Sequence, residues 1–173
     1  MPLVVAFRGV SPRIAASAFI AENATIVGDV EIGENASVWF GAVIRADFAH
    51  IRIGAKCNIQ DNVVAHGESR QTGLVLDDDV TVGHGAILHG SKIGRGCLIG
   101  MGAILLSNSV IGPNSLIAAG SVVRENDFIP ENSVAAGNPA VVKKALEGNA
   151  ARWVASGADS YVRLARYFRG VDV

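Results

Sequence analysis

Aliphatic residues recur every six positions along most of the chain. The step runs through four series: Ile14, Ile20, Ile26, Ile32, Val38 and Ile44; Ile53, Ile59 and Ala65; Leu76, Val82 and Leu88; and Ile93, Ile99, Leu105, Ile111, Ile117 and Val123. Four positions after most of these residues comes a small one, such as Ala24, Ala86 or Ser115. A hexapeptide period indicates a β-helix solenoid, in which each six-residue unit is one flat side of a three-sided coil. The pattern therefore predicts an all-β solenoid with the aliphatic residues pointing inward.

The pattern changes near the C-terminal end. The period stops at about Asn126, and Pro130 and Asn138-Pro139 indicate turns. Residues 141–144 and 150–169 have a helical pattern, with Trp153, Tyr161, Leu164, Ala165 and Phe168 on one apolar stripe. We therefore expect a single domain over residues 1–173, with a β-helix over about residues 10–125. An exit turn and a C-terminal α-helix, packed along the solenoid, should occupy about residues 126–173.

The bulk composition excludes several classes of protein. The formal net charge of −1 gives no reason to expect nucleic acid or an anionic membrane as a partner. Apolar runs are too short to span a membrane, and the N-terminus lacks the features of a signal peptide, so we expect a cytoplasmic protein. The two cysteines, Cys57 and Cys97, occupy the small inward position of the repeat. We interpret them as packing residues, because a buried free cysteine behaves as a small hydrophobic residue.

The six-residue step is broken at three places. Steps of nine, eleven and five residues follow positions 44, 65 and 88. The polar residues that begin these breaks are Arg45 and Asp47, His66 and Glu68, and His89. A regular solenoid needs none of these irregularities, so the breaks indicate a candidate functional site.

Counting three sides to each coil places positions 44, 65 and 88 above one another on one wall. Arg45, His66 and His89 each follow the inward residue, so we expect their side chains to form an outward column. Adjacent coils lie about 4.8 Å apart, which allows two imidazoles to converge on one metal ion.

The same count places positions 59 and 82 on a different wall, which carries Gln60, Asp61 and His84. His84 therefore cannot reach an ion held by His66 and His89 of its own chain. We predict that a second chain supplies it, in a homotrimer with three identical metal sites between subunits. The fourth histidine, His50, has no partner in this register, and we interpret it as incidental.

Three neutral imidazoles leave the fourth position of a tetrahedral ion open. This arrangement is typical of catalytic zinc, which acidifies a bound water toward neutral pH. Three imidazoles also accept iron or cobalt, so the cofactor prediction is Zn²⁺, with Fe²⁺ or Co²⁺ as alternatives.

The residues around this site form the motifs Ile44-Arg45-Ala46-Asp47, Asn58-Ile59-Gln60-Asp61, His66, Val82-Gly83-His84 and Leu88-His89-Gly90. Together these motifs resemble those of a known family, the gamma-class carbonic anhydrases. It extends to Ile99-Gly100-Met101-Gly102-Ala103 and Gly137-Asn138-Pro139-Ala140, and so covers nearly the whole chain.

The resemblance implies a left-handed parallel β-helix that assembles as a trimer and converts CO2 to bicarbonate with a metal-bound hydroxide. His66, His84 and His89 would be the metal ligands, and Gln60 would orient the hydroxide. Arg45, Asp47 and Asp61 would form ion pairs across the subunit interface, and Arg45 would guide bicarbonate.

The resemblance also implies two residues for proton transfer or contact near the site. Glu68 lies near the place of a proton-exporting glutamate, and Tyr161 matches a tyrosine that reaches the site from the C-terminal helix. The chain departs from the family's prototype in its short loop from His66 to Leu76, and in Phe48, which replaces an acidic residue.

Two other functions fit the same scaffold. An acyltransferase or acyl-CoA thioesterase of the hexapeptide class uses a single loop histidine as its base and does not need three histidines on two walls. A catalytically weak protein, in which the metal mainly holds the trimer together, is the other alternative.

Overall fold

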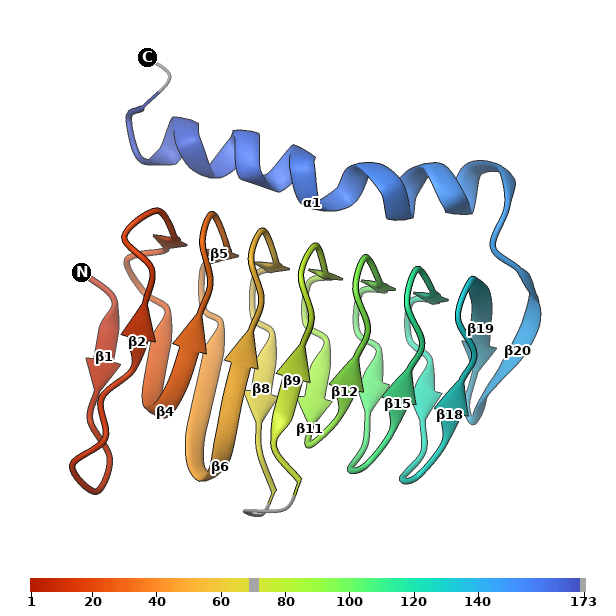
Figure 1. Cartoon of the computed structure of the whole chain (residues 1–173), viewed down its shortest axis with the longest axis horizontal. Coiled ribbons are helices and arrows are strands. Elements are labelled where there is room, and N and C mark those ends of the chain that lie inside the picture. Colours follow the sequence, from red (N-terminus) through yellow and green to blue (C-terminus); the bar gives the residue numbers. More distant parts are fainter. Residues whose placement is uncertain (69–71, 172–173) are drawn as a thin grey trace.

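The computed structural model describes residues 1–68 and 72–171 of the chain. Short strands stack in parallel into three walls that wind around one axis, and one long helix lies along the coils (Figure 1). This is the left-handed parallel β-helix with a C-terminal helix that the hexapeptide period and the family resemblance predict.

The strands divide among the walls in the predicted register. Wall 1 contains β1 (Leu3–Val5), the first parts of β4 (Thr25–Ile32) and β6 (Val43–Ile53), β8 (Val64–His66), β11 (Ile87–His89), β14 (Ile104–Leu105) and β17 (Val122–Val123). Wall 2 contains β2 (Arg13–Ile14), the second parts of β4 and β6, β9 (Leu74–Leu76), β12 (Lys92–Ile93), β15 (Val110–Ile111) and β18 (Phe128–Ile129). Wall 3 contains β3 (Phe19–Ile20), β5 (Ser37–Val38), β7 (Asn58–Ile59), β10 (Thr81–Val82), β13 (Leu98–Ile99), β16 (Leu116–Ile117), β19 (Ser133–Gly137) and β20 (Ala140–Ala145).

The inward residues of the period form the core. Ile44, Leu88, Ile59 and Val82 are among those with no exposed surface. The small residues fill the predicted corner positions, and both cysteines are buried there. The Cys57 thiol lies 3.0 Å from the Asp77 carbonyl oxygen, and the Cys97 thiol lies 3.1 Å from that of Gly112. The packing role of the cysteines is therefore confirmed.

The nine-residue step of the sequence is a long corner within β6. Residues 43–46 of β6 pair with residues 25–28 of β4, and pairing resumes at Ile51. Residues 47–50 thus lie outside the ladder and carry Asp47, Phe48 and His50. Gly28 approaches this corner closely with a φ of +80°, and a Cβ there would lie 2.3 Å from the Ala46 carbonyl oxygen. Only glycine fits at this position.

The exit from the solenoid differs from the prediction in two ways. The coils continue past Asn126, because Ile129 and Ala135 extend the six-residue step and pair with Ile111 and Ile117. Residues 141–144, predicted as helical, belong to β20, which pairs antiparallel with β19. The open edge of β19 supplies backbone partners for this segment, and its two β-branched valines favour a strand.

The C-terminal helix α1 (Gly148–Phe168) runs back along the coils toward the first one (Figure 1). It contacts β3, β5, β7, β10 and β13, all on wall 3. Its last turn stacks the Phe168 ring 5.6 Å from Phe19, and the Arg169 guanidinium donates hydrogen bonds to the carbonyl oxygens of Ser17 (2.6 Å) and Ala16 (3.2 Å). The predicted packing of this helix along the solenoid is confirmed. Across residues 1–68 and 72–171, no helix combines the length and the apolar character that a bilayer span requires.

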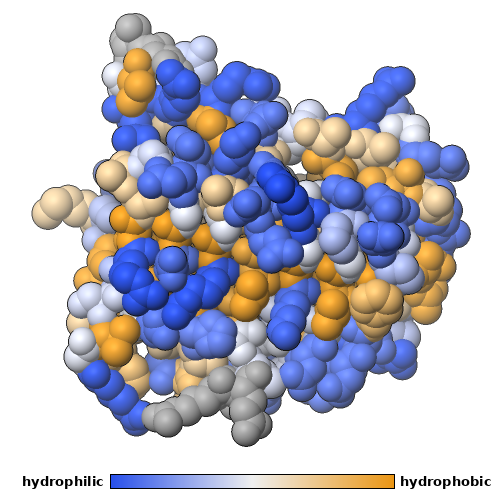
Figure 2. All heavy atoms as spheres, viewed as in Figure 1, coloured by the Kyte–Doolittle hydropathy of each residue, from blue (hydrophilic) through white to orange (hydrophobic). Residues whose placement is uncertain are grey.

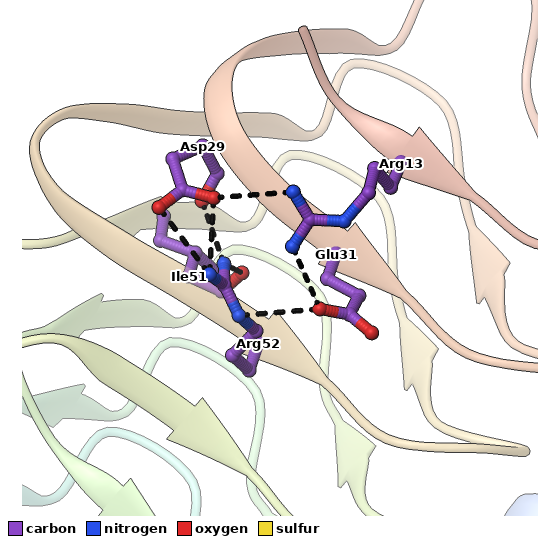
Figure 3. Close-up of polar contacts among 5 residues, drawn as sticks. All are labelled: Arg13, Asp29, Glu31, Ile51 and Arg52. Carbon is purple, nitrogen blue, oxygen red and sulfur yellow. Dashed lines mark hydrogen bonds and ion pairs between the residues drawn. The ribbon is translucent and has the colours of Figure 1, made fainter. Parts of the chain in front are cut away.

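Wall 2 carries two kinds of outward side chain. Over the first coils, Arg13, Glu31 and Arg52 stack in register, and Asp29 joins them (Figure 3). The Glu31 carboxylate lies 3.0 Å from Arg13 and 3.3 Å from Arg52, and Asp29 lies 3.0 Å from Arg52. Over the later coils the column becomes mainly apolar, in the order Val75, Lys92, Val110 and Phe128. A band of hydrophobic side chains accordingly crosses this face of the molecule (Figure 2).

Candidate metal centre

Wall 1 brings two of the predicted metal ligands together. His89 is paired with His66, and His66 with Arg45, in adjacent parallel strands. The two imidazole rings lie 5.3 Å apart between centroids, with planes tilted by 36°. The predicted column of Arg45, His66 and His89 is therefore confirmed.

Polar neighbours hold both imidazoles of this column. His66 Nε2 lies 2.8 Å from Asp47 Oδ1, and His89 Nδ1 lies 3.0 Å from Ser107 Oγ. An ionised carboxylate only accepts hydrogen bonds, so the proton of this contact is on the His66 nitrogen. Burial alone would raise the pKa of Asp47, but hydrogen bonds with His66 and Arg45 outweigh it and hold that pKa below its usual value. Asp47 thus remains a carboxylate that orients both the imidazole and the guanidinium.

Wall 3 carries the third histidine in a separate cluster. His84 follows β10, and its Nδ1 atom lies 2.7 Å from Asp61 Oδ2. The contact with Asp61 places the proton on Nδ1, which leaves Nε2 of a neutral ring with a lone pair for a metal. The backbone N–H of His84 donates to Gln60 Oε1 at 3.1 Å, so the carboxamide lies beside this histidine.

The carboxamide of Gln60 belongs to a buried chain of hydrogen bonds. Gln60 Nε2 donates to Asn58 Oδ1 at 3.1 Å, and Asn58 Nδ2 donates to Thr81 Oγ1 at 2.9 Å. Gln60 is 6% exposed and Asn58 has no exposed surface. A hydrogen-bonded amide in such a place keeps one orientation, since turning it would leave buried groups unpaired.

One chain holds these groups in two halves. His66 and His89 project from wall 1, whereas His84 projects from wall 3, which belongs to a different sheet. Among the described residues, no group of three or more His, Cys, Asp and Glu side chains within one chain could hold a metal ion. The geometry of each half nevertheless fits a metal centre, because every one of the three imidazoles has a polar neighbour that fixes its ring.

Tyr161 and Glu68, which the resemblance connects with contact near the site and with proton transfer, lie beside these halves. Tyr161 of α1 packs its ring 5.4 Å from Trp39 on wall 3. Burial raises the pKa of Tyr161, and the negative charge of Asp61 adds to this effect, which places the phenol in the electrostatic field of the His84 half. Glu68 follows β8 and is exposed, and residues 69–71 after it lie outside the described residues.

Three contacts at the site were not predicted from the sequence. The Phe48 ring lies edge-on to His66 with centroids 5.8 Å apart, so the residue that departs from the family pattern covers one side of this imidazole. Ser107 bonds His89 from the next coil, and Thr81 ends the amide chain. The register gives a signal for the last two, because Ser107 follows the strand paired with β11, and Thr81 is paired with Asn58.

Comparison with known proteins agrees with the fold and the motifs. The family described as "Bacterial transferase hexapeptide (six repeats)" matches residues 11–46 and 90–125 of the chain. A protein of Geobacillus kaustophilus named carbonic anhydrase is 46% identical over 170 residues, which cover 98% of this chain and 93% of that protein. The mitochondrial gamma carbonic anhydrase 2 of Arabidopsis thaliana is 38% identical over 90% of this chain and 58% of its own length.

A solved structure gives the same fold under another name. The Bacillus cereus protein, named as a candidate acetyltransferase, is 40% identical, and the match covers 99% of each chain with a TM-score of 0.95. Identity is 46% and 38% with the two proteins named carbonic anhydrases and 40% with this structure, in each case over 90% or more of this chain. The chain therefore belongs to the gamma carbonic anhydrase family of hexapeptide-repeat proteins.

Proposed function

We propose that this protein is a metal-dependent carbonic anhydrase, which hydrates CO2 to bicarbonate at sites between the subunits of a homotrimer. The observation that carries the proposal is the division of three oriented imidazoles into a pair on wall 1 and a single one on wall 3. Threefold symmetry would bring wall 1 of one chain against the exposed corner after β10 of the next chain, which carries His84 beside the face that α1 covers, and complete three equivalent sites.

The outward surface of wall 1 supports such an interface. Beside the column of charged and imidazole residues runs a second column of β-branched side chains in paired register: Val43, Val64, Ile87, Ile104 and Val122. Val64 and Ile87 are 41% and 40% exposed in the single chain. Covering a continuous apolar strip of this kind would contribute favourably to association.

Zn²⁺, Fe²⁺ or Co²⁺ would be held by His66 and His89 of one chain and His84 of its neighbour. When bound, the ion would supply Lewis acidity, which lowers the pKa of water toward neutrality. The protein itself orients the three imidazole rings: Asp47 fixes that of His66, Asp61 that of His84, and Ser107 that of His89. Three rings held in this way need little reorganisation to receive a metal.

The remaining residues act on the substrate and the proton. The fixed Gln60 carboxamide would hydrogen-bond the attacking oxygen and align it toward CO2. The Arg45 guanidinium, in contact with Asp47, would bind the bicarbonate anion. Exposed Glu68 would accept a proton for transfer to solvent, and Tyr161 would steady the Asp61 side of the site from α1.

An acyltransferase or acyl-CoA thioesterase is the second candidate. It is favoured by the name of the Bacillus cereus structure and by a groove of about 690 Å³ on wall 2, lined by Val75, Lys92, Val110 and Phe128 among others. This groove lies on a different wall from all three ligand histidines, so it does not explain their arrangement. A metal-stabilised trimer with little activity is the third candidate.

Metal content and CO2 hydration, measured on the purified wild type, His89→Ala and His50→Ala, separate the three functions. His50→Ala is the matched control, because it removes an imidazole from the β6 corner outside the proposed ligand set. The proposal expects one metal per chain and rapid hydration in the wild type and the control, with both lost in His89→Ala. Metal without hydration would favour the metal-stabilised trimer, and acyl-CoA hydrolysis or transfer without metal dependence would favour the second candidate.

A further inference from the structure

The hydrogen-bond chain at Gln60 ends beneath the C-terminal helix. Ser37, Asn58 and Thr81 are paired in register on β5, β7 and β10, with side chains on the outward face of wall 3. Their exposed fractions are 1%, 0% and 6%, because α1 lies over this face. These polar side chains are therefore sealed from solvent, and each must find its partners inside the protein.

The direction of each amide in this chain follows from one backbone group. The His84 N–H can only donate, so the atom of Gln60 that faces it at 3.1 Å must be the oxygen. The Nε2 atom of Gln60 then faces Asn58 and donates a hydrogen bond, so the atom of Asn58 that accepts it at 3.1 Å must be the oxygen Oδ1. Asn58 Nδ2 is consequently turned toward Thr81 Oγ1 at 2.9 Å. Neither amide can turn over without leaving a buried donor facing another donor.

Thr81 is held in its place by α1. A Cβ added at Gly157 would lie 2.6 Å from Thr81 Oγ1 and 3.4 Å from its Cβ, so the helix backbone passes directly over this hydroxyl. Glycine inside a helix lowers the stability of the helix relative to alanine. The absence of a side chain at this helical position is what lets α1 approach wall 3 so closely.

We propose that Thr81, enclosed by Gly157 of α1, is a positioning residue that fixes the carboxamide of Gln60. The catalytic consequence rests on the proposed carbonic anhydrase function, whereas the effect on the orientation of Gln60 does not. The hydroxyl oxygen of Thr81 accepts a hydrogen bond from Asn58, and the amide oxygen of Asn58 accepts one from Gln60. The carboxamide of Gln60 is thereby held in one orientation beside His84. The C-terminal helix is thus connected to the site through three side chains rather than only covering a wall.

Thr81→Val tests this role, because it keeps the shape of the side chain and removes the acceptor. Thr81→Ser is the matched control, because it keeps the hydroxyl. We expect kcat for CO2 hydration to fall about fivefold in Thr81→Val with KM unchanged, and to stay within about twofold of wild type in Thr81→Ser. In a Gln60→Ala background, Thr81→Val should have no further effect on kcat, because its action passes through Gln60. An equal loss in both backgrounds would overturn the positioning role.

A second measurement does not depend on catalysis. The chain has two glutamines, Gln60 and Gln71, so selective ¹⁵N labelling gives two side-chain amide pairs, which Gln71→Glu assigns. The Gln60 protons should be resolved and exchange slowly with solvent in the wild type and Thr81→Ser, and exchange at least about tenfold faster in Thr81→Val. Unchanged exchange in Thr81→Val would overturn the proposal even in an active enzyme. Faster exchange in a protein that does not hydrate CO2 would support the positioning of Gln60 and reject the carbonic anhydrase function instead.

The contribution of the helix is tested separately with Gly157→Ala. Alanine favours the helix itself, so a purely structural role for this position predicts unchanged Gln60 signals. The proposal expects the opposite, with Thr81 displaced, faster exchange of the Gln60 amide and lower kcat. Wild-type exchange and kcat in Gly157→Ala would remove α1 from the proposal.

Discussion

Mixing two inactive variants should restore activity if the metal sites lie between subunits. His89→Ala lacks a wall 1 ligand and His84→Ala lacks the wall 3 ligand, so a trimer of either variant alone has no complete site. In a mixed trimer, a complete site forms where wall 1 of a His84→Ala chain meets the corner after β10 of a His89→Ala chain, which keeps His84. Every mixed trimer contains such a junction once, whatever its composition.

The magnitude follows from the register and threefold symmetry. Random assembly of equal amounts leaves about one site in four complete, because each site needs one particular variant on each side of the interface. We therefore expect about a quarter of the wild-type metal content and CO2 hydration after the two variants are unfolded together and refolded, against a background near zero for each alone. Hydration is followed by stopped flow with a pH indicator, and metal by elemental analysis of the isolated trimers.

His66→Ala provides the control for this experiment. Mixed with His84→Ala it should also recover about a quarter, because its defect is on wall 1. Mixed with His89→Ala it should recover nothing, because His66 and His89 must come from the same chain. Recovery in this last mixture, or none in the first, would refute the assignment of the histidines to two walls of different chains.

Two further predictions concern the core. Leu88→Ala removes a side chain with no exposed surface from the middle of the coils, so the free energy of unfolding should fall by about 2–5 kcal/mol. Urea titrations at fixed protein concentration measure this change, and a loss below about 1 kcal/mol would contradict the packing described. Burial raises the pKa of Cys57 to about 12 and that of Cys97 to about 11 from an ordinary value of 9.0, so both thiols should react with a disulfide reagent at pH 8 only after unfolding. Rapid reaction of the native protein with the reagent would refute the burial of these thiols. Because the folded chain keeps the thiol protons, their contribution to the free energy of unfolding is complete below about pH 9 and is lost as the pH rises toward 12. Denaturant midpoints measured from pH 8 upward would show this loss.

Much of the fold could be predicted because one inward residue repeats every six positions. A slip of one residue would turn Leu88 outward and His89 inward, so the hydrophobic pattern fixes the register, and the register fixes which polar residues share a wall. The column of Arg45, His66 and His89 followed from this count alone. The end of the solenoid did not, because Asn126 and Pro130 have turn propensities and also occur at solenoid corners, as the left-handed φ of 63° at Asn126 shows.

Contacts between segments far apart in sequence were beyond the sequence pattern. Nothing in the six-residue period indicates that Gly157 faces Thr81, because that contact depends on how close α1 approaches wall 3. The edge-on placement of Phe48 against His66 depends likewise on the path of the long corner in β6. Register predicts what stacks within a wall, whereas the distances between a wall and the elements outside it follow from packing of particular side chains.

The return of α1 to the first coil changes how this protein can fold. A solenoid without such a return contacts only neighbouring coils and can fray from either end in small steps. Here Phe168 and Arg169 bind to Phe19, Ser17 and Ala16, which joins the two ends of the stack. The ribosome releases the first coil about 150 residues before the helix that covers it, so the outward face of wall 3 remains uncovered until α1 has been synthesised. Once the helix docks, no terminal coil can detach without also breaking contacts made by the other end, and we expect unfolding to be a single all-or-none event.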